Sequence, residues 1–590
     1  MREQSTRQLY NGIVEKQMKN FDMQALALKS RRGPGYNYHT NVRNAEVHMI
    51  RESFYFALSL LDRNSEGDAE LAAAIIGRLL DFQELNREHP DFGNWPYYME
   101  EAIADMASPD RNWADFCGKA LIQATVDHAD KLPSELMNRM RTGVEAAAVL
   151  IMRRNVMPSY TNICIMGTYV ALLAGELLGN RELFAYGRSK LELLHEYCTL
   201  HGAFTEYNSP TYTVVAIEDL SLMLRHIRDN ASLDMVGELH DMAWASVAEH
   251  YHSKTRQWAG PHSRSYETLQ GREFLSFLQL AGQGRLSLLG EDELAIGPLW
   301  ARVGLRMPSQ YVPYFGQGRA TSYSEKVIVK GPTPVVASSY LTPEYTLGSF
   351  NHCDLWNQRR PLTAYWGEAD RSSSLRLRCL HDDYDFSSGL LHTVQHRGLL
   401  LGIAGFCSDH GDKHFVLDPL GGSVVASSML LRFEFGGERS RLVLPERVEL
   451  GQPLLIRAAH VTIGIILLDC RFGSHTPQVR VTEDETMTAL EIVLYEGEPA
   501  ALTLNEMKQA HLAFGLVMES ADCPEEVMLA QLGNMKADND SECLQLVYED
   551  AAKKLKLESP TGVSPFKQSM QHVEGTKDIR IEANAPIWSV

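Results

Sequence analysis

Paired cysteines are missing from this sequence. Its nine cysteines are widely spaced and include no CxxC pair. An odd number of scattered cysteines is not a disulfide framework, and the spacing fits no standard zinc site. We therefore predict reduced thiols, no bound metal and no cofactor.

Long apolar runs are missing as well. The chain begins MREQSTRQLYNGIVEKQ, which is polar and lacks the apolar segment of a secretory signal. We find no uninterrupted apolar run of about 18 residues, the length that crosses a membrane. The sequence therefore predicts a cytoplasmic protein with no membrane partner, and an oligomer is possible.

Positively charged residues are fewer than negatively charged ones. The 590 residues include 56 Lys and Arg against 75 Asp and Glu, a formal net charge of −19. Nucleic-acid binders normally present a basic surface, so we predict no nucleic-acid partner. An acidic chain also repels anionic polymers at long range, so an anionic substrate would require a locally basic pocket.

The hydrophobic periodicity changes once along the chain. Up to about residue 305, apolar residues recur every three or four positions, as in EVHMIRESFYFALSLLD and RELFAYGRSKLELLHEYC, which predicts amphipathic helices. We also predict helix over NGIVEKQMKNFDMQALAL. Short connections between the segments favour antiparallel neighbours and an α/α toroid.

After about residue 322, short β-rich segments replace the helical pattern. Examples are SEKVIVKG, SLRLRCL and LLIRAAHVTIGIILLD, separated by Gly, Pro, Asp and Ser. Such runs without amphipathic helices between them predict antiparallel sheets packed face to face. The predicted organisation is an α/α toroid at 1–310, a linker at 311–325 and an antiparallel β-sandwich domain at 326–590.

Polar and aromatic residues crowd into the connection HGAFTEYNSPTYTVVAIED, residues 201–219. It lies between two predicted helices, and binding residues concentrate on such loops. Its candidate residues are Glu206, Tyr207, Asn208 and Tyr212. The alternative is a loop whose aromatics pack and whose polar groups cap helices.

Two other helix junctions carry similar residues. Asn162 stands at a predicted helix start, where Asn is also a preferred N-cap. The segment WAGPHSRSYE supplies Trp258, His262, Arg264 and Tyr266 around a Gly-Pro turn. Because the junctions of a toroid meet at one rim, we expect these loops to lie together.

Aromatic residues elsewhere could contact sugars. The stretch FGNWPYY contains Trp95 and Tyr98, whose rings could stack on the apolar face of a sugar or belong to the core. In the strand-rich half, Arg359 and Arg360 could supply local positive charge or form interdomain salt bridges. The segment DHGDKH at 409–414 is interpreted as a turn in preference to a metal site.

This arrangement resembles the polysaccharide lyases built as an α/α toroid followed by β-sandwich domains, among them hyaluronan, chondroitin and toroidal alginate lyases and heparinase II/III-like enzymes. Their Gly-Ser-Phe, Gln-His and Tyr loop resembles 202–212 here. The resemblance implies that Tyr212 takes the place of the catalytic Tyr, with Tyr207 where the pattern has His. It also matches Asn162 and the pair Ser263-Arg264 to family positions.

Elimination at a uronate has its own chemical requirements. The C5 proton is alpha to a carboxylate, which must be neutralised as enolate-like charge develops. A base must reach C5, and an acid must protonate the leaving oxygen. We predict that Asn162, His262 and Arg264 bind the carboxylate and that Tyr207 or Tyr212 transfers protons. These residues are expected to line one cleft that faces Arg359 or Arg360.

Two other function classes remain open. An α/α-barrel glycoside hydrolase, such as a glucuronidase or an unsaturated-uronide hydrolase, would use Glu206, Glu218 or Asp219 as acid and base. A carbohydrate-binding protein without catalysis would need the aromatic residues but not the set of Glu206, Tyr212, His262 and Arg264. The expected partner is an acidic oligo- or polysaccharide in either enzyme class.

Overall fold

The computed structural model describes residues 3–295, 297–316, 320–445 and 447–579. It divides into two compact units. The helical unit comprises Met1–Glu206, Tyr212–Ala245 and Arg272–Val312, and the β unit comprises Tyr207–Thr211, Ser246–Gly271 and Pro313–Val590. The predicted domains at 1–310 and 326–590 therefore require a correction, because two short segments of the helical half belong to the β unit.

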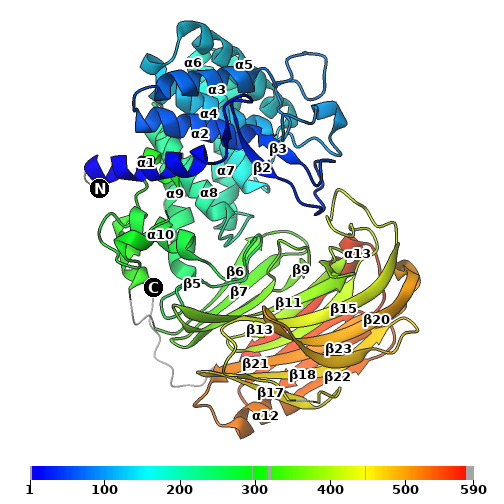
Figure 1. Cartoon of the computed structure of the whole chain (residues 1–590). Coiled ribbons are helices and arrows are strands. Elements are labelled where there is room, and N and C mark those ends of the chain that lie inside the picture. The colour runs from blue at the N-terminus through cyan, green and yellow to red at the C-terminus, as the bar shows by residue number, and fades with distance from the viewer. Residues whose placement is uncertain (1–2, 296, 317–319, 446, 580–590) are drawn as a thin grey trace. The chain divides into compact units, whose positions relative to one another are not determined.

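The described helices of the N-terminal half follow the predicted periodicity over most of its length (Figure 1). They are α1 (Glu3–Met18), α2 (Ile50–Arg63), α3 (Asp68–Leu80), α4 (Trp113–Asp127), α5 (Ser134–Arg154), α6 (Thr161–Leu178), α7 (Arg181–His201), α8 (Tyr212–His226), α9 (Asn230–His250), α10 (Arg272–Ala281) and α11 (Pro298–Val303).

The helices form two rows. In one row α2 packs against α4, α4 against α6 and α6 against α8, while α3, α5 and α7 contact one another in the same succession. Consecutive helices also pair across the rows, as α2 with α3, α4 with α5 and α6 with α7. Double rows of consecutive helix pairs are the arrangement of an α/α toroid, which confirms the predicted fold class.

Residue type explains how the helix pairs turn. Gly179 follows α6 with φ +64°, a conformation that an L side chain rarely adopts. Asn180 then caps α7, since its side-chain oxygen accepts the backbone N–H groups of Glu182 and Leu183 at 3.0 and 3.2 Å. Gly202 ends α7 in the same left-handed region, φ +66°.

One inner helix is unusually apolar. The 18 residues of α6 have a mean hydropathy of 1.4, enough by length and composition to cross a membrane, but 83% of them are buried inside the structure. The core helix of a folded domain has these properties, so the feature is weak evidence for a membrane span. The sequence prediction did not single it out because Thr, Gly and Glu residues interrupt its apolar positions.

The helix predicted past Met18 is wrong. A small antiparallel sheet takes its place, with strands β1 (Phe21–Asp22), β2 (Ala27–Arg31) and β3 (Glu46–Met49). The side chain of Asp22 accepts the N–H groups of Gln24 and Ala25 at 2.8 and 3.1 Å. This local turn competes with helix and explains why the apolar spacing alone was misleading.

The β unit contains three larger antiparallel sheets. The first has nine strands: β19 (Gln478–Glu483), β20 (Met487–Thr503), β15 (Ser423–Gly437), β11 (Arg371–His381), β10 (Leu362–Glu368), β8 (Tyr345–Phe350), β7 (Val335–Leu341) and β6 (Ser322–Val329), with β12 (Tyr384–Asp385) on β11. The second has seven: β16 (Leu442–Val443), β17 (Pro453–Ala458), β18 (Val461–Phe472), β21 (Ala510–Ser520), β14 (Leu399–Phe406), β13 (Gly389–His396) and β9 (His352–Asp354). The third has four: β22 (Met535–Asn539), β23 (Cys543–Glu549), β24 (Lys553–Pro560) and β25 (Glu574–Ile579).

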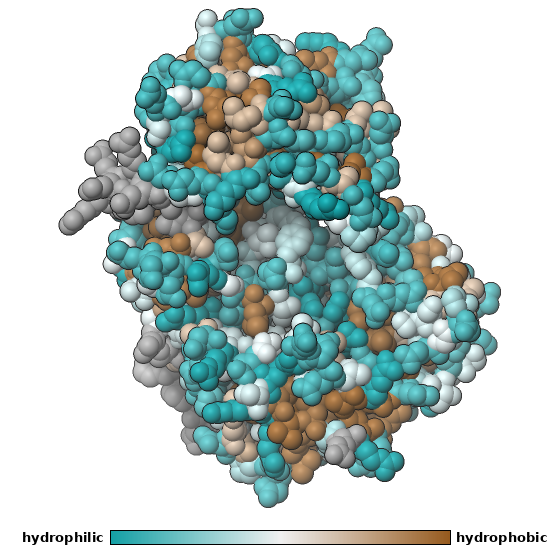
Figure 2. All heavy atoms as spheres, viewed as in Figure 1, coloured by the Kyte–Doolittle hydropathy of each residue, from teal (hydrophilic) through white to brown (hydrophobic). Residues whose placement is uncertain are grey.

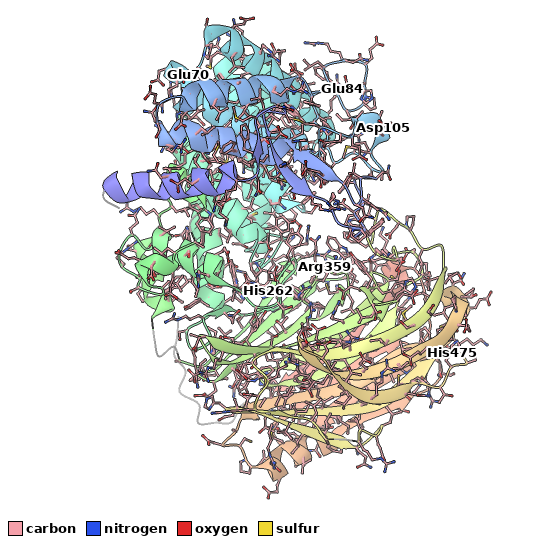
Figure 3. The ribbon with its side chains drawn as sticks, viewed as in Figure 1. Glu70, Glu84, Asp105, His262, Arg359 and His475 are labelled. Atoms are coloured by element: carbon pink, nitrogen blue, oxygen red, sulfur yellow. The ribbon has the colours of Figure 1, made fainter. Side chains whose placement is uncertain are left out.

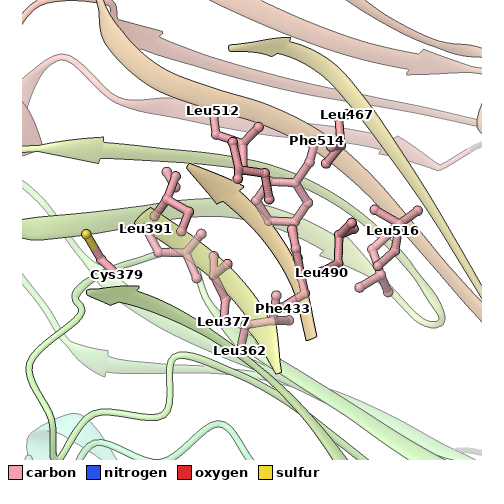
Figure 4. Packing of buried hydrophobic residues seen from close by; sticks show 14 of the residues in the cluster. Leu362, Leu377, Cys379, Leu391, Phe433, Leu467, Leu490, Leu512, Phe514 and Leu516 are labelled. Carbon is pink, nitrogen blue, oxygen red and sulfur yellow. The ribbon is translucent and has the colours of Figure 1, made fainter. Parts of the chain in front are cut away.

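The seven-stranded sheet is buried on both faces. Along β14, Leu400 packs into the core shared with the nine-stranded sheet, whereas Leu399 and Leu401 pack toward the four-stranded sheet. Side chains alternate across a strand, so a strand between two cores is apolar throughout. Figure 4 shows the first core, in which Phe433 and Phe514 meet edge to face at 5.1 Å.

Two short helices interrupt the strand-rich half, where none was predicted. They are α12 (Glu525–Gly533) and α13 (Phe566–Gln571). Met528 and Leu532 of α12 are buried in the core of the four-stranded sheet. Polar side chains cover much of the visible surface of each unit, with apolar patches among them (Figure 2).

Candidate functional site

A buried amide–carboxylate pair lies at the start of α6 in the helical unit. Glu206 Oε2 accepts hydrogen bonds from the backbone N–H of Asn162 at 2.7 Å and from its Nδ2 at 2.6 Å. Only 1% of Asn162 and 7% of Glu206 is exposed. Glu206 thereby satisfies a free N–H group of the first helical turn, where the helix dipole favours negative charge.

Asn162 retains an acceptor that nothing uses. Its Oδ1 atom is buried and has no hydrogen-bond partner among the described residues. Leaving a buried polar group unpaired costs about 1–3 kcal/mol, so such a group calls for an explanation. A sugar hydroxyl or a protonated carboxyl group would supply the missing donor.

Tyr212 begins the neighbouring helix α8 and is half-buried. It follows Glu206 by only six residues, and α6 packs against α8. The short connection places the start of α8 at the same end of the toroid as the Asn162–Glu206 pair. The structure therefore brings three predicted catalytic residues, Asn162, Glu206 and Tyr212, to one end of the helical unit.

A cavity of about 360 Å³ opens beside these helices in the same unit. Its lining includes side chains from α2, α4, α8 and α11, among them Arg51, Tyr55, Phe116, Lys119, Glu218 and Trp300. Val215 also lines it, one turn after Tyr212 on α8. The volume lies in the range of about 300–1,000 Å³ that is usual for small-molecule sites.

Charged groups in the cavity wall are paired within the wall. Lys119 Nζ lies 2.7 Å from Asp219 Oδ1, and the two residues are 3% and 0% exposed. The Asp219 carboxylate beside it holds the pKa of Lys119 above its usual value, against the effect of burial. Asp219 is therefore a counter-ion inside the protein, which contradicts its predicted role as an acid or base that acts on a sugar.

Glu218 is one of two glutamates that line this cavity, the other being Glu52. Burial raises its pKa to about 7, while nearby Lys119 acts in the opposite direction. Trp300 Nε1 donates a hydrogen bond to Glu218 Oε1. A carboxyl group that titrates near neutral pH can hold or release a proton under working conditions.

The middle of the 201–219 segment, Tyr207–Thr211, belongs to the β unit and is part of a structural network. Asn208 Nδ2 donates to the backbone oxygens of Ala259 and Pro261 at 2.7 and 2.9 Å, and Asn208 Oδ1 accepts from Trp258 Nε1 at 2.5 Å. Asn208 and Trp258 are 1% and 0% exposed. The polar side-chain atoms of both residues are used by partners inside the protein, so their predicted binding roles are corrected to structural ones.

Tyr207 and His262 are also buried in this network. The Tyr207 hydroxyl lies 3.0 Å from His250 Nε2, and Tyr207 is only 3% exposed. His262 is 0% exposed, and its Nδ1 lies 2.6 Å from the backbone oxygen of Asn208. Burial lowers the pKa of His262 to about 3, so the imidazole is neutral at pH 7 and cannot neutralise a carboxylate.

Burial likewise raises the pKa of the Tyr207 hydroxyl far above its usual value. A buried phenol with a high pKa is a poor base and has no path to a substrate. The predicted catalytic roles of Tyr207 and His262 are therefore corrected to structural ones.

Close backbone packing fixes this network on the nine-stranded sheet. A Cβ atom added to Gly348 of β8 would lie 2.0 Å from the backbone oxygen of Gly260, and one added to Gly260 would lie 1.8 Å from Thr363 Oγ1. Only glycine fits at either position. His262 and Arg360 then exchange two backbone hydrogen bonds of 3.0 Å, which extends the contact.

Two arginines of the β unit flank one indole ring. The guanidinium carbons of Arg264 and Arg359 lie 4.9 and 5.6 Å from the ring centroid of Trp356. Arg264 Nε donates to Gln358 Oε1 at 2.8 Å, and Arg359 Nη1 donates to the backbone oxygen of Ser263 at 2.6 Å. Both arginines are half-buried, and Figure 3 shows Arg359 close to His262. Arg359 Nε also forms an ion pair with Asp354 Oδ2 at 3.3 Å, so the arginine pair is a local positive feature whose charge is partly neutralised within the protein.

Arg360 and Tyr266 lie next to this pair. Arg360 is 5% exposed, and its Nη1 donates to the backbone oxygens of Asn357 and Arg359 at 2.7 and 2.8 Å. Burial lowers the pKa of Arg360 to about 10. Arg360 is thus a structural residue, whereas Tyr266 is 55% exposed and remains accessible to a ligand.

The aromatic stretch near residue 95 likewise contains one buried residue and one that is partly exposed. Trp95 is 0% exposed, and its Nε1 donates to the backbone oxygen of Leu79 at 3.1 Å. It packs edge to face against Phe54 at 5.9 Å, so its predicted sugar-stacking role is wrong. Tyr98 is half-buried, and its role in binding stays a prediction.

Sequence reasoning missed part of the helical site and most of the network. Lys119 was not singled out, although a lysine within the apolar helix WADFCGKALIQATVD is itself a signal of a buried charge. Trp300 and Tyr55 carry no local signal because only the packing of distant helices brings them together. The expectation that the helical residues share one cleft with Arg264 and Arg359 stays a prediction.

One group of residues in the β unit has ligand-type atoms close together. Cys407, Asp409 and His410 offer atoms within 4.8 Å of one another among the described residues. Asp409 Oδ1 already accepts the N–H of Phe566 at 2.6 Å, and burial raises the pKa of the Cys407 thiol to about 12. A structural zinc site normally has four ligands, so we assign no metal here.

Comparisons with known proteins give distant similarities. A family model described as "Domain of unknown function (DUF8769)" matches residues 16–296. No curated protein matches the chain.

Among solved structures, the chain is similar to the chondroitin AC lyase of Streptomyces coelicolor A3 in complex with chondroitin sulphate, with 10% identity and a TM-score of 0.46 over 94% of this chain and 89% of that chain. It is also similar to heparinase III, with 10% identity and a TM-score of 0.46 over 93% and 86%. The endoglucanase CelQ from Clostridium thermocellum gives 9% identity and a TM-score of 0.19 over 80% and 82%. Similarities of this size identify neither a substrate nor a reaction.

Proposed function

We propose that this protein cleaves an oligo- or polysaccharide that contains uronic acid by β-elimination, with Tyr212 as the proton-transfer residue. The observation that carries the proposal is the buried, unpartnered Oδ1 of Asn162 near the start of α8. A cytoplasmic location and an acidic saccharide as the partner belong to the same proposal.

Asn162 can assist enolate formation if the uronate carboxyl group binds in its protonated form, because the unpartnered Oδ1 is an acceptor and Nδ2 already donates to Glu206. Removal of the C5 proton moves negative charge onto the uronate carboxyl group, which is stabilised if that group holds a proton or accepts hydrogen bonds. A protonated carboxyl group could donate its hydrogen bond to Asn162 Oδ1. Glu206 accepts one hydrogen bond from the side-chain amide of Asn162 and one from its backbone N–H, and is therefore a positioning residue in this proposal.

Tyr212 has the chemistry to move the protons. A phenol donates a proton to the leaving oxygen at C4, and a phenolate accepts one from C5. Tyr212 is the first residue of α8 and is half-buried, and α8 packs against α6, whose first turn contains Asn162. The predicted alternative, Tyr207, lacks this access because it is buried against His250.

The arginine pair of the β unit supports an acidic ligand. Guanidinium groups recognise carboxylates and sulfates by paired hydrogen bonds. Arg264 and Arg359 supply this chemistry beside Trp356, and Arg359 also has Asp354 as an ion-pair partner. In a chain of net charge −19, such a local feature is what an anionic ligand would require.

The test is a panel of uronic-acid oligosaccharides incubated with the wild-type protein and with Tyr212→Phe. Elimination creates an unsaturated uronate that absorbs ultraviolet light, and each cleavage also creates a reducing end. We expect both signals from the wild type and neither above background from Tyr212→Phe. If the protein binds an oligosaccharide but gives neither signal, it belongs to the class of carbohydrate-binding proteins without catalysis.

A second candidate is glycoside hydrolysis through Glu218. The observation that favours it is a cavity-lining carboxyl group whose pKa lies near 7, as a general acid requires. Asp219 does not serve as its partner because it is fully buried against Lys119. Hydrolysis would give reducing ends without ultraviolet absorbance, and Glu218→Gln would abolish them.

A further inference from the structure

We propose that the cavity of the helical unit binds an uncharged pyranose ring, stacked on Trp300 and hydrogen-bonded to Glu218. The inference depends on the proposed function in one respect only, which is that the bound ring lies one helical turn from the proposed catalytic residue Tyr212. It names the kind of sugar that the adjoining position accepts: a neutral residue and not the uronate itself.

The cavity wall offers aromatic surface of the kind that sugars use. Trp300, Phe116 and Tyr55 come from three different helices, and all three line the cavity. Phe277 packs edge to face against Trp300 at 5.4 Å and fixes its ring. A pyranose presents an apolar face of axial C–H bonds that packs on such a ring, while its equatorial hydroxyls remain free for hydrogen bonds.

The cations of the wall are not available to an anionic sugar. Lys119 is paired with Asp219 at 2.7 Å, and Arg302 with Asp62 at 2.5 Å. Arg51 Nε donates to Glu52 Oε1 at 3.0 Å. A carboxylate in the cavity would have to compete with the buried partners Asp219 and Asp62, which is costly in a low dielectric, and with Glu52, whose side chain is 33% exposed.

Glu218 is the carboxyl group of the cavity that is not part of an ion pair in the described structure. One oxygen accepts the N–H of Trp300, so the indole and the carboxyl group are held together. Its surroundings are Lys119 from α4, Asp219 from α8, and Arg51, Glu52 and Tyr55 from α2. Protonated, Glu218 donates to a sugar hydroxyl, and ionised, it accepts from one and repels a uronate.

The test is equilibrium binding measured by calorimetry, with methyl glucoside and methyl glucuronide as matched probes that offer no bond for elimination. At pH 8 we expect the neutral probe to bind at least tenfold more tightly than the uronide. Trp300→Ala should weaken binding of the neutral probe at least tenfold, whereas Trp300→Phe should retain most of it. Tyr36→Ala, which removes an exposed aromatic of the helical unit, is the matched control and should change nothing.

Glu218→Gln provides an independent variant, because it conserves volume and the hydrogen bond to Trp300. We expect the variant to bind the neutral probe with an affinity within a few-fold of wild type. We also expect a smaller ratio between its affinities for the neutral probe and for the uronide. Equal affinity for both probes in the wild type, binding unaffected by Trp300→Ala, or no binding of either probe would overturn the inference. Because no turnover is involved, intact binding alongside absent elimination would refute only the proposed function.

Discussion

The two units treat buried polar groups in different ways. In the helical unit, Lys119 and Asp219 pair deep in the wall of a cavity that stays open, and Asn162 keeps an unused acceptor. In the β unit, Asn208 accepts a hydrogen bond from Trp258 Nε1 and donates to the backbone oxygens of Ala259 and Pro261. The first arrangement leaves space and unused capacity for a ligand, whereas the second uses its capacity to seat a loop on a sheet.

This difference teaches how to separate two kinds of polar loop. Residues of the same types, Asn, Tyr and His, occur in both units, so residue type does not tell them apart. What distinguishes Asn162 from Asn208 is that both amide atoms of Asn208 have partners inside the protein, whereas Asn162 Oδ1 has none among the described residues.

The largest expected effect concerns the two tyrosines of one loop. Tyr212→Phe should lower kcat for elimination by about 10²–10⁴, the usual contribution of a proton-transfer group. Tyr207→Phe should change kcat by less than tenfold but lower stability by about 1–3 kcal/mol, because His250 loses its buried partner. Steady-state kinetics and urea unfolding of both variants check this. Equal losses of kcat would break the contrast.

The buried ion pair of the helical unit should show a large effect on stability. Lys119→Met leaves the Asp219 carboxylate buried and uncompensated, which we expect to cost about 3–5 kcal/mol. The double variant Lys119→Met with Asp219→Leu removes both charges and should recover most of that loss. Urea denaturation measures both. A single variant within 1 kcal/mol of wild type, on the scale of an exposed pair, would show that the pair is not buried in solution.

The hydrogen-bond network of the β unit should show a smaller, purely structural effect. Asn208→Ala leaves the Trp258 N–H and two backbone oxygens without their partner. We expect a loss of about 1–3 kcal/mol in unfolding free energy. Saccharide affinity, measured at a temperature where the variant is folded, should stay within a few-fold of wild type. A large loss of affinity with unchanged stability would restore Asn208 as a binding residue.

The smallest predicted effect is a pH dependence from His262. Its pKa is about 3 in the folded protein against 6.5 for the free side chain, so below pH 6.5 the unfolded state binds a proton that the folded state does not. Stability from this group is therefore complete above pH 6.5 and is lost as the pH falls toward 3, at most about 1.4 kcal/mol per pH unit. The neighbouring groups His250, Arg360 and Tyr365 remain in the variant.

Urea unfolding of wild type and His262→Gln between pH 7 and pH 5 measures this slope. The variant should lose less stability on acidification than the wild type does. Identical slopes would mean that His262 is accessible to protons in the folded protein.

The fold was predictable because its signal is periodic. Apolar residues every three or four positions define α7 and α8, and short β-rich runs define β11 and β18. The exception near Asp22 arose where a side chain satisfied backbone N–H groups locally and so ended the helix.

The site was predictable only in part. The positions of Asn162, Glu206 and Tyr212 at helix junctions follow from sequence, since a junction is visible as a break in periodicity. Burial is different: Trp95 and Tyr98 occur three residues apart, yet one is in the core and the other half-exposed. Trp300 approaches Glu218 across 82 residues of chain, a contact that no local pattern encodes.

The most direct test of the account is the ratio of unsaturated uronate to new reducing ends during digestion of the best oligosaccharide in the panel. β-Elimination creates one of each per bond broken, so the account predicts a ratio of one from the first turnover onward. Reducing ends that accumulate without ultraviolet absorbance, in a reaction that Glu218→Gln abolishes and Tyr212→Phe does not, would contradict it.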